Sequence, residues 1–214
     1  PYIGFVYPAG GRQGTAFQIR LGGQRLDGVE RVLVSGPGVK ATLVEYYRRL
    51  NNQELRLLRE QLKELRQQQR AKKEAAGQDE TAEKLDEATE TLIVRLKKRL
   101  AEDVRRPACR ANAEVVVAEV TVAPDAEPGR REIRLATLRG VSNPLVFEIG
   151  QLLEVARKPI GICPLPFLGR EEAALRDRPE EEVEQRIVVP CTINGQIAPG
   201  EVNHYRFEAH EGQR

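Results

Sequence analysis

The sequence has few of the residues on which catalytic and metal centres usually depend. Its 214 positions hold two histidines, three cysteines, no methionine and no tryptophan, and aromatic residues make up only 5%. The cysteines Cys109, Cys163 and Cys191 form no CxxC pair and have no neighbouring histidine, which argues against a structural zinc site. An odd cysteine count is compatible with one disulfide and with buried free thiols alike.

Strong charge of one sign and long apolar runs are also lacking. The 34 Lys and Arg residues nearly balance the 32 Asp and Glu residues, so no global field draws nucleic acid or an anionic membrane. No apolar run approaches the ~20 residues that a membrane-spanning helix needs. We therefore expect no nucleic-acid partner and no membrane insertion. Because the chain opens at Pro1, we expect a processed form or a segment of a longer protein, and the missing signal peptide leaves the compartment open.

What the sequence does have is a regular alternation of apolar and polar residues between Ala113 and Gly150. Turn-forming residues break this alternation at 124–129 and 140–144, which predicts three strands joined by two turns. A period of two is typical of an antiparallel sheet with one buried face. The residues expected on that face are Val116, Ala118, Val120, Val122, Ile133, Leu135, Leu145, Phe147 and Ile149.

Residues 2–44 show the same alternation in shorter runs punctuated by Gly and Pro. Short strands about 8 to 12 residues apart predict a β-sandwich, in which residues 2–44 and 113–150 close over one interior. The stretch Gly36–Ala41 imitates a dinucleotide-binding fingerprint. However, Pro37 and the β-branched residues after it favour a strand over the helix that a pyrophosphate site needs. We therefore expect a strand, a turn and a second strand here, and no cofactor.

Between Arg49 and Arg106 the pattern changes to leucines spaced by three and four residues. This spacing predicts two amphipathic helices, the first with the narrow apolar stripe of a coiled-coil seam. Asn51 with Glu54 predicts a helix start, Gly77 a reversal and Pro107 the end of the second helix, so we expect an antiparallel helical hairpin. The leucines are Leu55, Leu58, Leu62 and Leu65 in the first series and Leu85, Leu92, Leu96 and Leu100 in the second.

The hairpin is highly charged, with 15 basic and 12 acidic residues between Arg49 and Arg106. Its tip, Gln67–Lys73, is basic, but no aromatic residue lies nearby as a stacking platform for nucleic acid. Two interpretations stay open: the leucine stripes pack against each other, or the hairpin meets a partner or a second copy of itself. The residues assigned to this surface are Leu55, Leu58, Leu62 and Leu65, with Tyr46 and Tyr47 where the chain leaves the sheet.

The two histidines give no support to a catalytic or metal site. His204 and His210 lie on one side of a predicted strand, opposite an inward-facing Tyr205 and Phe207, and six residues of strand span roughly 20 Å. That separation is too long for a shared metal, and neither histidine is placed to activate a cysteine. We therefore expect no catalytic residue and no enzyme activity.

The C-terminal part divides into a linker and a short β segment. Residues 151–186 are punctuated by proline and are expected to form a linker, with one short helix within Glu171–Arg186. Residues 187–214 return to strand alternation, with turns at Asn194–Gly195 and Pro199–Gly200. Two or three strands are too few for a stable sheet on their own.

Two segments resemble known families. The turn PAGGRQGT at Pro8–Thr15 leading into FQIRLGG, together with APDAEPGRREIRLATLRGVSNPLVFEI at 123–149, resembles an immunoglobulin-like IPT/TIG domain. This resemblance implies an Ig-like sandwich over residues 1–150, interrupted by the hairpin at 49–106. At 191–214, CTINGQIAPGEVNHYRFEAHEGQR is similar to the opening of a bacterial pre-peptidase C-terminal (PPC) domain, which implies that a second sandwich starts at about 187.

Together the resemblances imply a secreted or envelope-associated bacterial protein, located outside the cell, at its surface or in the periplasm. The expected fold class is mainly β with an α insertion: an Ig-like antiparallel β-sandwich carrying an antiparallel helical hairpin, then a linker and the first strands of a second β-sandwich. The expected function is non-catalytic recognition or spacing, with a protein or glycan as partner. The alternatives are an accessory region of a secreted hydrolase and self-assembly through the hairpin.

Overall fold

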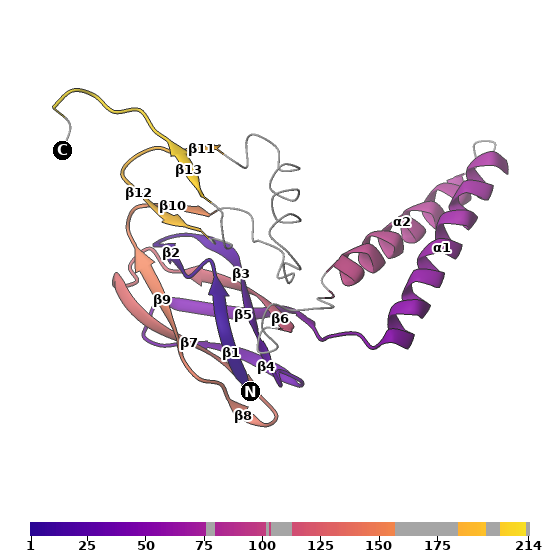
Figure 1. Cartoon of the computed structure of the whole chain (residues 1–214), viewed down its shortest axis with the longest axis horizontal. Helices are drawn as coiled ribbons and strands as arrows, with labels where there is room; N and C mark the ends of the chain where they lie inside the picture. The colour runs from indigo at the N-terminus through magenta and orange to yellow at the C-terminus, as the bar shows by residue number, and fades with distance from the viewer. Residues whose placement is uncertain (76–79, 102, 104–112, 157–183, 196–201, 213–214) are drawn as a thin grey trace. The chain divides into compact units, whose positions relative to one another are not determined.

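The chain folds into two compact units, one formed by Pro1–Tyr46 with Arg106–Arg214 and the other by Tyr47–Arg105 (Figure 1). The computed structural model describes residues 1–75, 80–101, 103, 113–156, 184–195 and 202–212. The first unit is built of strands and the second is a pair of helices. The expected class, mainly β with an inserted helical hairpin, is therefore confirmed.

The first sheet has the strand order β1-β3-β6-β5. β3 lies between β1 and β6 and is antiparallel to both. The register places Leu21 opposite Val116 and Ile19 opposite Ala118, so apolar residues of neighbouring strands share one face. The four strands are β1 (Tyr2–Tyr7), β3 (Ala16–Gln24), β6 (Glu114–Val122) and β5 (Val39–Tyr47).

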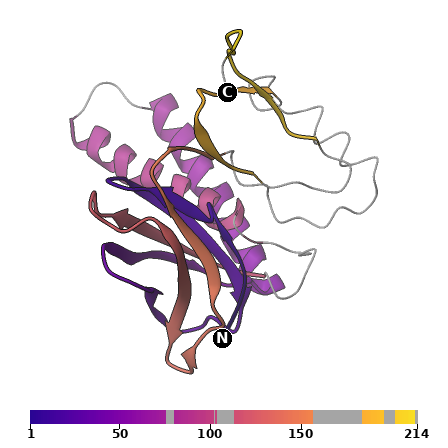
Figure 2. The same ribbon diagram turned by 90° about the vertical axis from the view of Figure 1, so that its left-hand side faces the viewer.

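The second sheet has the order β2-β9-β7-β4. Its strands β7 and β9 are drawn in pink to orange in Figures 1 and 2. β7 is antiparallel to β4 and β9, while β2 pairs with β9 in parallel. A short strand, β8, adds to β7 through the pair Ala136 and Val141. The strands are β2 (Gly10–Arg12), β9 (Leu145–Gly150), β7 (Gly129–Thr137), β4 (Val29–Val34) and β8 (Gly140–Val141).

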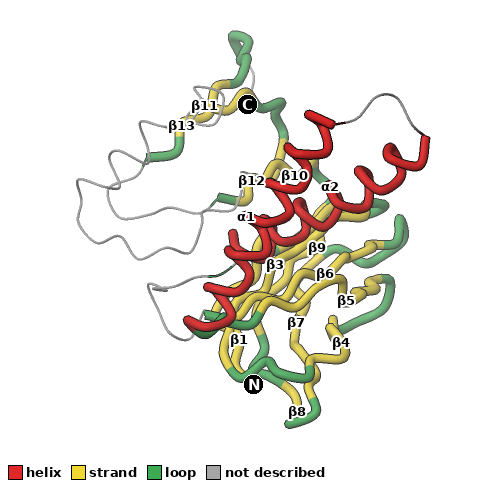
Figure 3. Tube along the Cα trace, turned by 90° about the vertical axis from the view of Figure 1, so that its right-hand side faces the viewer, coloured by secondary structure: helices red, strands yellow, loops and turns green. Residues whose placement is uncertain are grey.

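The second unit is the predicted hairpin. Helix α1 spans Asn52–Ala75 and helix α2 spans Glu80–Ala101, and the two pack side by side (Figures 1 and 3). The reversal expected at Gly77 and the stop expected at Pro107 lie outside the described residues. Both helices interrupt the sheet between β5 and β6, as the change of periodicity predicts.

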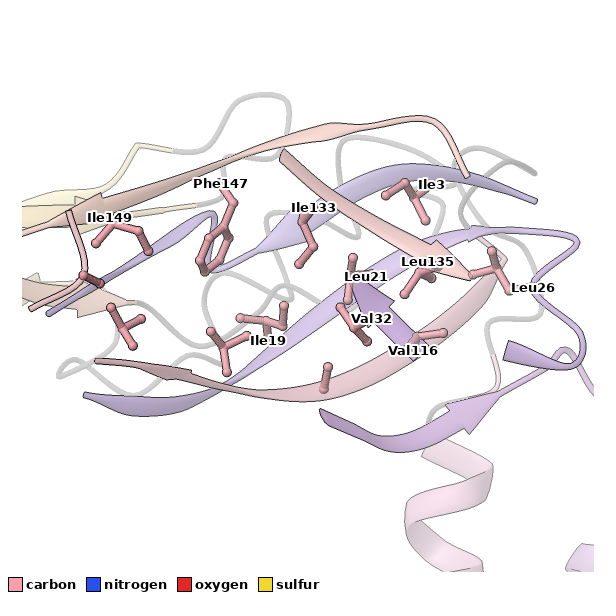
Figure 4. Close-up of a cluster of buried hydrophobic side chains, with 14 residues drawn as sticks. Ile3, Ile19, Leu21, Leu26, Val32, Val116, Ile133, Leu135, Phe147 and Ile149 are labelled. Atoms are coloured by element: carbon pink, nitrogen blue, oxygen red, sulfur yellow. The ribbon is translucent and has the colours of Figure 1, made fainter. Parts of the chain in front are cut away.

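Both sheets contribute side chains to one apolar core (Figure 4). Ile3, Leu21 and Val116 from the first sheet and Ile133 and Phe147 from the second have no solvent-exposed surface. Burial of side chains this large supplies most of the stabilisation of such a two-layer arrangement, at about 1.5–3 kcal/mol each. The predicted shared interior of residues 2–44 and 113–150 is therefore present.

One expectation about this core is wrong. The strands between Ala113 and Gly150 do not form one sheet, because β6 belongs to the first sheet and β7 and β9 to the second. β6 is moreover buried on both faces near its start: Val115 and Val117 are 2% and 6% exposed. Alternation reports which face of a strand is apolar, but two strands that face each other across a core have the same alternation as two strands that pair.

The C-terminal strands form two parallel pairs. β10 (Leu153–Ala156) pairs with β12 (Cys191–Asn194), and β11 (Glu184–Arg186) pairs with β13 (His204–Arg206). The segment expected to be a linker thus carries a strand at each end, while residues 157–183, with most of the expected short helix, lie outside the described residues. The expectation that Phe207 points inward is wrong, because its side chain is 53% exposed after β13 has ended.

Asn194 joins this C-terminal region to the turn between β1 and β2. Its backbone carbonyl accepts a hydrogen bond from the Tyr7 hydroxyl at 3.1 Å, and its side-chain oxygen accepts one from the Ala9 N–H at 3.2 Å. Its amide nitrogen also donates to Glu154 on β10. Burial raises the pKa of the Glu154 carboxyl, and the bond from Asn194 opposes that rise.

A glycine at the β1–β3 contact gives a testable consequence. A Cβ at Gly23 would lie 2.0 Å from the carbonyl oxygen of Tyr2, and neither backbone can move without breaking the β1–β3 pairing. Gly23→Ala should therefore lower the free energy of unfolding by about 1–3 kcal/mol in urea titrations. At Gly150 a Cβ meets only Glu154, at 3.5 Å. Gly150→Ala should change stability by less than about 0.5 kcal/mol, and equal midpoints for the two variants would contradict this account.

Candidate functional site

The hairpin begins at the N-cap that the sequence predicts. The Glu54 backbone N–H donates to the Asn51 side chain at 2.8 Å, and the Glu54 carboxylate accepts from the Asn51 backbone N–H at 2.9 Å. This reciprocal capping box satisfies two N–H groups that a helix N-terminus otherwise leaves unpaired. Arg48 also forms an ion pair with Glu54. The bond from Arg48, followed by that from Asn51, lowers the pKa of the Glu54 carboxyl to about 2.

The foot of the hairpin, where residues 47–50 lead into α1, is closed by Arg99 in the last turn of α2 and by Asp103 after its end. Arg99 donates to the backbone carbonyl of Arg48 at 2.6 Å, and its guanidinium lies 5.7 Å from the centre of the Tyr47 ring. The Asp103 carboxylate accepts a hydrogen bond from the Leu50 N–H at 2.9 Å. These contacts bind the segment entering α1 to the segment leaving α2. Tyr47, assigned to the interaction surface, is 7% exposed and packs in this foot.

Tyr46, the other tyrosine assigned to that surface, takes part in a network within the first unit. Its hydroxyl donates to Glu114 at 2.7 Å, with Asp27 at 3.1 Å from the same oxygen. Burial and these two carboxylates raise the pKa of the Tyr46 hydroxyl far above its usual range. The Glu114 carboxylate also accepts the backbone N–H groups of Arg25 and Leu26, at 2.9 and 2.8 Å. Nothing in the sequence marked Glu114, because its partners are distant in the chain.

The leucines of α1 lie where the periodicity placed them. Leu55 is buried at 7% exposure, and Leu58, Leu62 and Leu65 are half-buried on the same side of the helix. In α2 the expectation for Leu92 is wrong, because that side chain is 50% exposed while the neighbouring Ile93 is buried at 5%. The run Leu92–Ile93–Val94 has three apolar residues, and Ile93 is the one that continues to the buried Leu96 at three-residue spacing.

A shallow groove of about 430 Å³ runs along α1 beside this apolar stripe. Four cations border it at intervals of four, three and four residues, so they share one face of the helix. Among the side chains that the structure describes, which leave out 72–86, none of the four has a carboxylate within ion-pair distance. The nearby Arg56, in contrast, is paired with Glu60 at 2.9 Å. The lining residues are Arg59, Leu62, Lys63, Arg66, Gln67 and Arg70.

The described residues were also compared with the other possibilities that the sequence raises: a metal site, reactive cysteines, a nucleotide-binding turn and a membrane-spanning helix. The described residues contain no group of three or more His, Cys, Asp or Glu side chains that could hold a metal ion. Cys191 is a free, half-buried thiol, and Cys109 and Cys163 lie outside the described residues. Gly36 and Gly38 form the turn between β4 and β5, which confirms the expected strand-turn-strand arrangement. Neither of the described helices combines the length and apolar character needed to span a membrane.

The Tyr46 network predicts a stability effect. Tyr46→Phe should lower the free energy of unfolding by about 1 kcal/mol, because the Glu114 carboxylate loses one donor. Glu114→Ala should cost about 1–3 kcal/mol, since two backbone N–H groups lose their acceptor. Glu119→Ala, exposed on the same strand, is the matched control. If chemical denaturation shows that Glu119→Ala lowers the free energy of unfolding as much as Glu114→Ala does, Glu114 does not have this stabilising role.

The capping box predicts a pH dependence. The pKa of Glu54 is lowered in the folded hairpin. The stabilising contribution of the ionised carboxylate is therefore complete above about pH 4.3, the pKa of glutamate in an unfolded chain. It is lost as the pH falls towards about 2. The difference in thermal midpoint between the intact chain and Glu54→Gln, followed by helical circular dichroism, should be largest near neutral pH and vanish near pH 2. A difference that stays constant over that range would contradict the assignment.

Comparison with protein-family models finds no match for this chain. Comparison with curated protein sequences finds no match either.

Proposed function

We propose that this chain is a non-catalytic recognition module, in which an Ig-like sandwich carries a helical hairpin as its contact arm for a protein partner. The strand order supports the Ig-like part. The sheets β1-β3-β6-β5 and β9-β7-β4 correspond to the ABED and GFC sheets of immunoglobulin domains, and β2, parallel to β9, adds an edge strand. On that correspondence the hairpin occupies the connection between strands D and E.

The observation that carries the proposal is the cationic face of α1. A connection between two neighbouring strands needs only a few residues, whereas this one contains two helices with their own cap and their own closed foot. Long ordered insertions of this kind usually have a function. Arg59, Lys63, Arg66 and Arg70 line a groove and lack ion-pair partners among the described side chains, which leave out 72–86. These four charges are therefore available to another molecule.

The proposed setting is that of a secreted or surface-associated bacterial protein, with the C-terminal strands as the start of a PPC-like domain. The sequence resemblances support this setting. A glycan bound by the exposed loops is the alternative ligand. Self-assembly through the hairpin is a second candidate function. It is favoured by Leu57, Leu92 and Val94, three apolar side chains on the helices that are 55%, 50% and 62% exposed.

Replacing residues 49–106 by a short Gly/Ser loop tests the proposal. Since β5 and β6 are neighbours in the sheet, such a loop can join them. The β unit of the shortened chain should still unfold cooperatively. Proteins that cross-link to the intact chain at the surface of the source cells should no longer cross-link to the shortened chain. If both chains cross-link to the same proteins, the hairpin is not the contact arm. Light scattering on the same pair tests self-assembly: that candidate is wrong if both chains are monomers.

A further inference from the structure

We propose that the groove on α1 binds an acidic α-helix of a partner protein, with carboxylates repeating once per turn along one face. This inference rests on the proposed function, because it names the chemistry of the partner that the hairpin would contact. It is carried by the spacing of the four cations, by the apolar side chain next to them and by the acidic residues on the adjoining face of the helix.

The spacing of the charges matches a helix. Arg59 and Arg70 are 11 residues apart in α1, which corresponds to about 16 Å along the helix axis. Lys63 and Arg66 lie between them on the same face, so a positive group occurs about once per turn for three turns. Glutamates at intervals of four, three and four residues on a second helix repeat at the same distances. Side-by-side helices would therefore bring each carboxylate to one cation, as do the flanking charges of a coiled coil.

The groove also has an apolar component. Leu62 lies at the edge of the groove, beside the cations, and is only half-buried by the hairpin itself. The aliphatic parts of Arg59, Lys63 and Arg66 extend the apolar lining away from Leu62, since long basic side chains leave only their ends in water. A partner helix with one apolar residue beside its carboxylates would cover Leu62. An amphipathic helix laid in a groove has this combination of apolar anchor and flanking charge.

Acidic neighbours make a nucleic acid a poor occupant. Glu60 and Glu64 are exposed on α1 one position after Arg59 and Lys63. They place negative charge on the adjoining face of α1, which opposes a polyanion that extends past the cationic stripe but not a helix whose acidic face is narrow. The sequence between Tyr47 and Phe147 also has no aromatic residue on which bases could stack.

The carboxylates of the hairpin whose side chains are described do not neutralise the cations of the groove. Glu60 is held by Arg56 at 2.9 Å, and Glu90 of α2 accepts a hydrogen bond from Gln69 at 3.0 Å. Gln69 lies on the side of α1 that faces α2, so this bond joins the helices and leaves the cationic stripe open. A second copy of the chain remains a competing occupant, and the experiment includes it.

The test uses the intact chain and two synthetic peptides. The first is a helical peptide with glutamates at intervals of four, three and four residues around one leucine, and the second has the same composition with the glutamates distributed around the helix. Fluorescence anisotropy should show binding of the first peptide that weakens with added salt. Lys63→Glu/Arg66→Glu should weaken that binding about tenfold or more. The matched control is Arg95→Glu/Lys97→Glu, which makes the same charge change at exposed positions of α2 and should weaken binding less than about twofold.

The possible results separate the competing occupants. The inference would be overturned if the two peptides bind equally well. It would also be overturned if Lys63→Glu/Arg66→Glu and Arg95→Glu/Lys97→Glu lose the same affinity for the first peptide. Tighter binding of single-stranded poly(dT) with the same dependence on Lys63 and Arg66 would replace the helix with a nucleic acid. A dimer in light scattering that Lys63→Glu/Arg66→Glu converts to a monomer would assign the groove to a second copy. If cross-linking depends on the hairpin but not on these charges, the proposed function stands and this inference fails.

Discussion

The structure depends on strand β6 being held between β3 and β5 after the chain has made a long helical excursion. The alternating residues Val116, Ala118, Val120 and Val122 of β6 belong to the core that both sheets share, so a displaced β6 would open that core. At the first residue of β6, Glu114 binds two backbone N–H groups next to β3 and the Tyr46 hydroxyl of β5. This carboxylate therefore joins the strand that leaves for the hairpin to the strand that returns from it.

The β unit itself holds β5 and β6 together where the chain leaves for the hairpin and returns from it. The hairpin can therefore be stabilised by its own contacts. Its N-terminus is capped by Asn51 and Glu54, and its foot is closed by Arg99 and Asp103. Leu55, Ile93 and Leu96 supply its apolar interior. A helix pair of this kind gains most of its stability from packing one apolar stripe, which leaves the remaining faces free to carry charge. The surface chemistry of α1 is thus not required by the fold.

The candidate site was only partly accessible to sequence reasoning. The leucine stripe of α1 and the capping box follow from spacing alone, and the structure places both as expected. The sequence alone does not locate the basic groove, although Arg59, Lys63, Arg66 and Arg70 stand in it at helical spacing. Charges can be counted in a sequence, but whether each is paired depends on side-chain geometry. Arg56 pairs with Glu60, while the four cations of the groove pair with no carboxylate among the side chains described outside 72–86.

The sequence by itself determined the local elements: the strands that became β6, β7 and β9, the two helices, the start of α1 and the turn at Gly36 and Gly38. Each depends on neighbours within a few residues, whose periodicity and capping groups are visible in the chain. Only the tertiary structure decided that β6 pairs with β3 while β7 and β9 form the opposite sheet, and that Glu114 meets Tyr46. Alternation specifies a buried face, whereas the strand that covers or pairs with it is selected by packing between residues far apart in sequence.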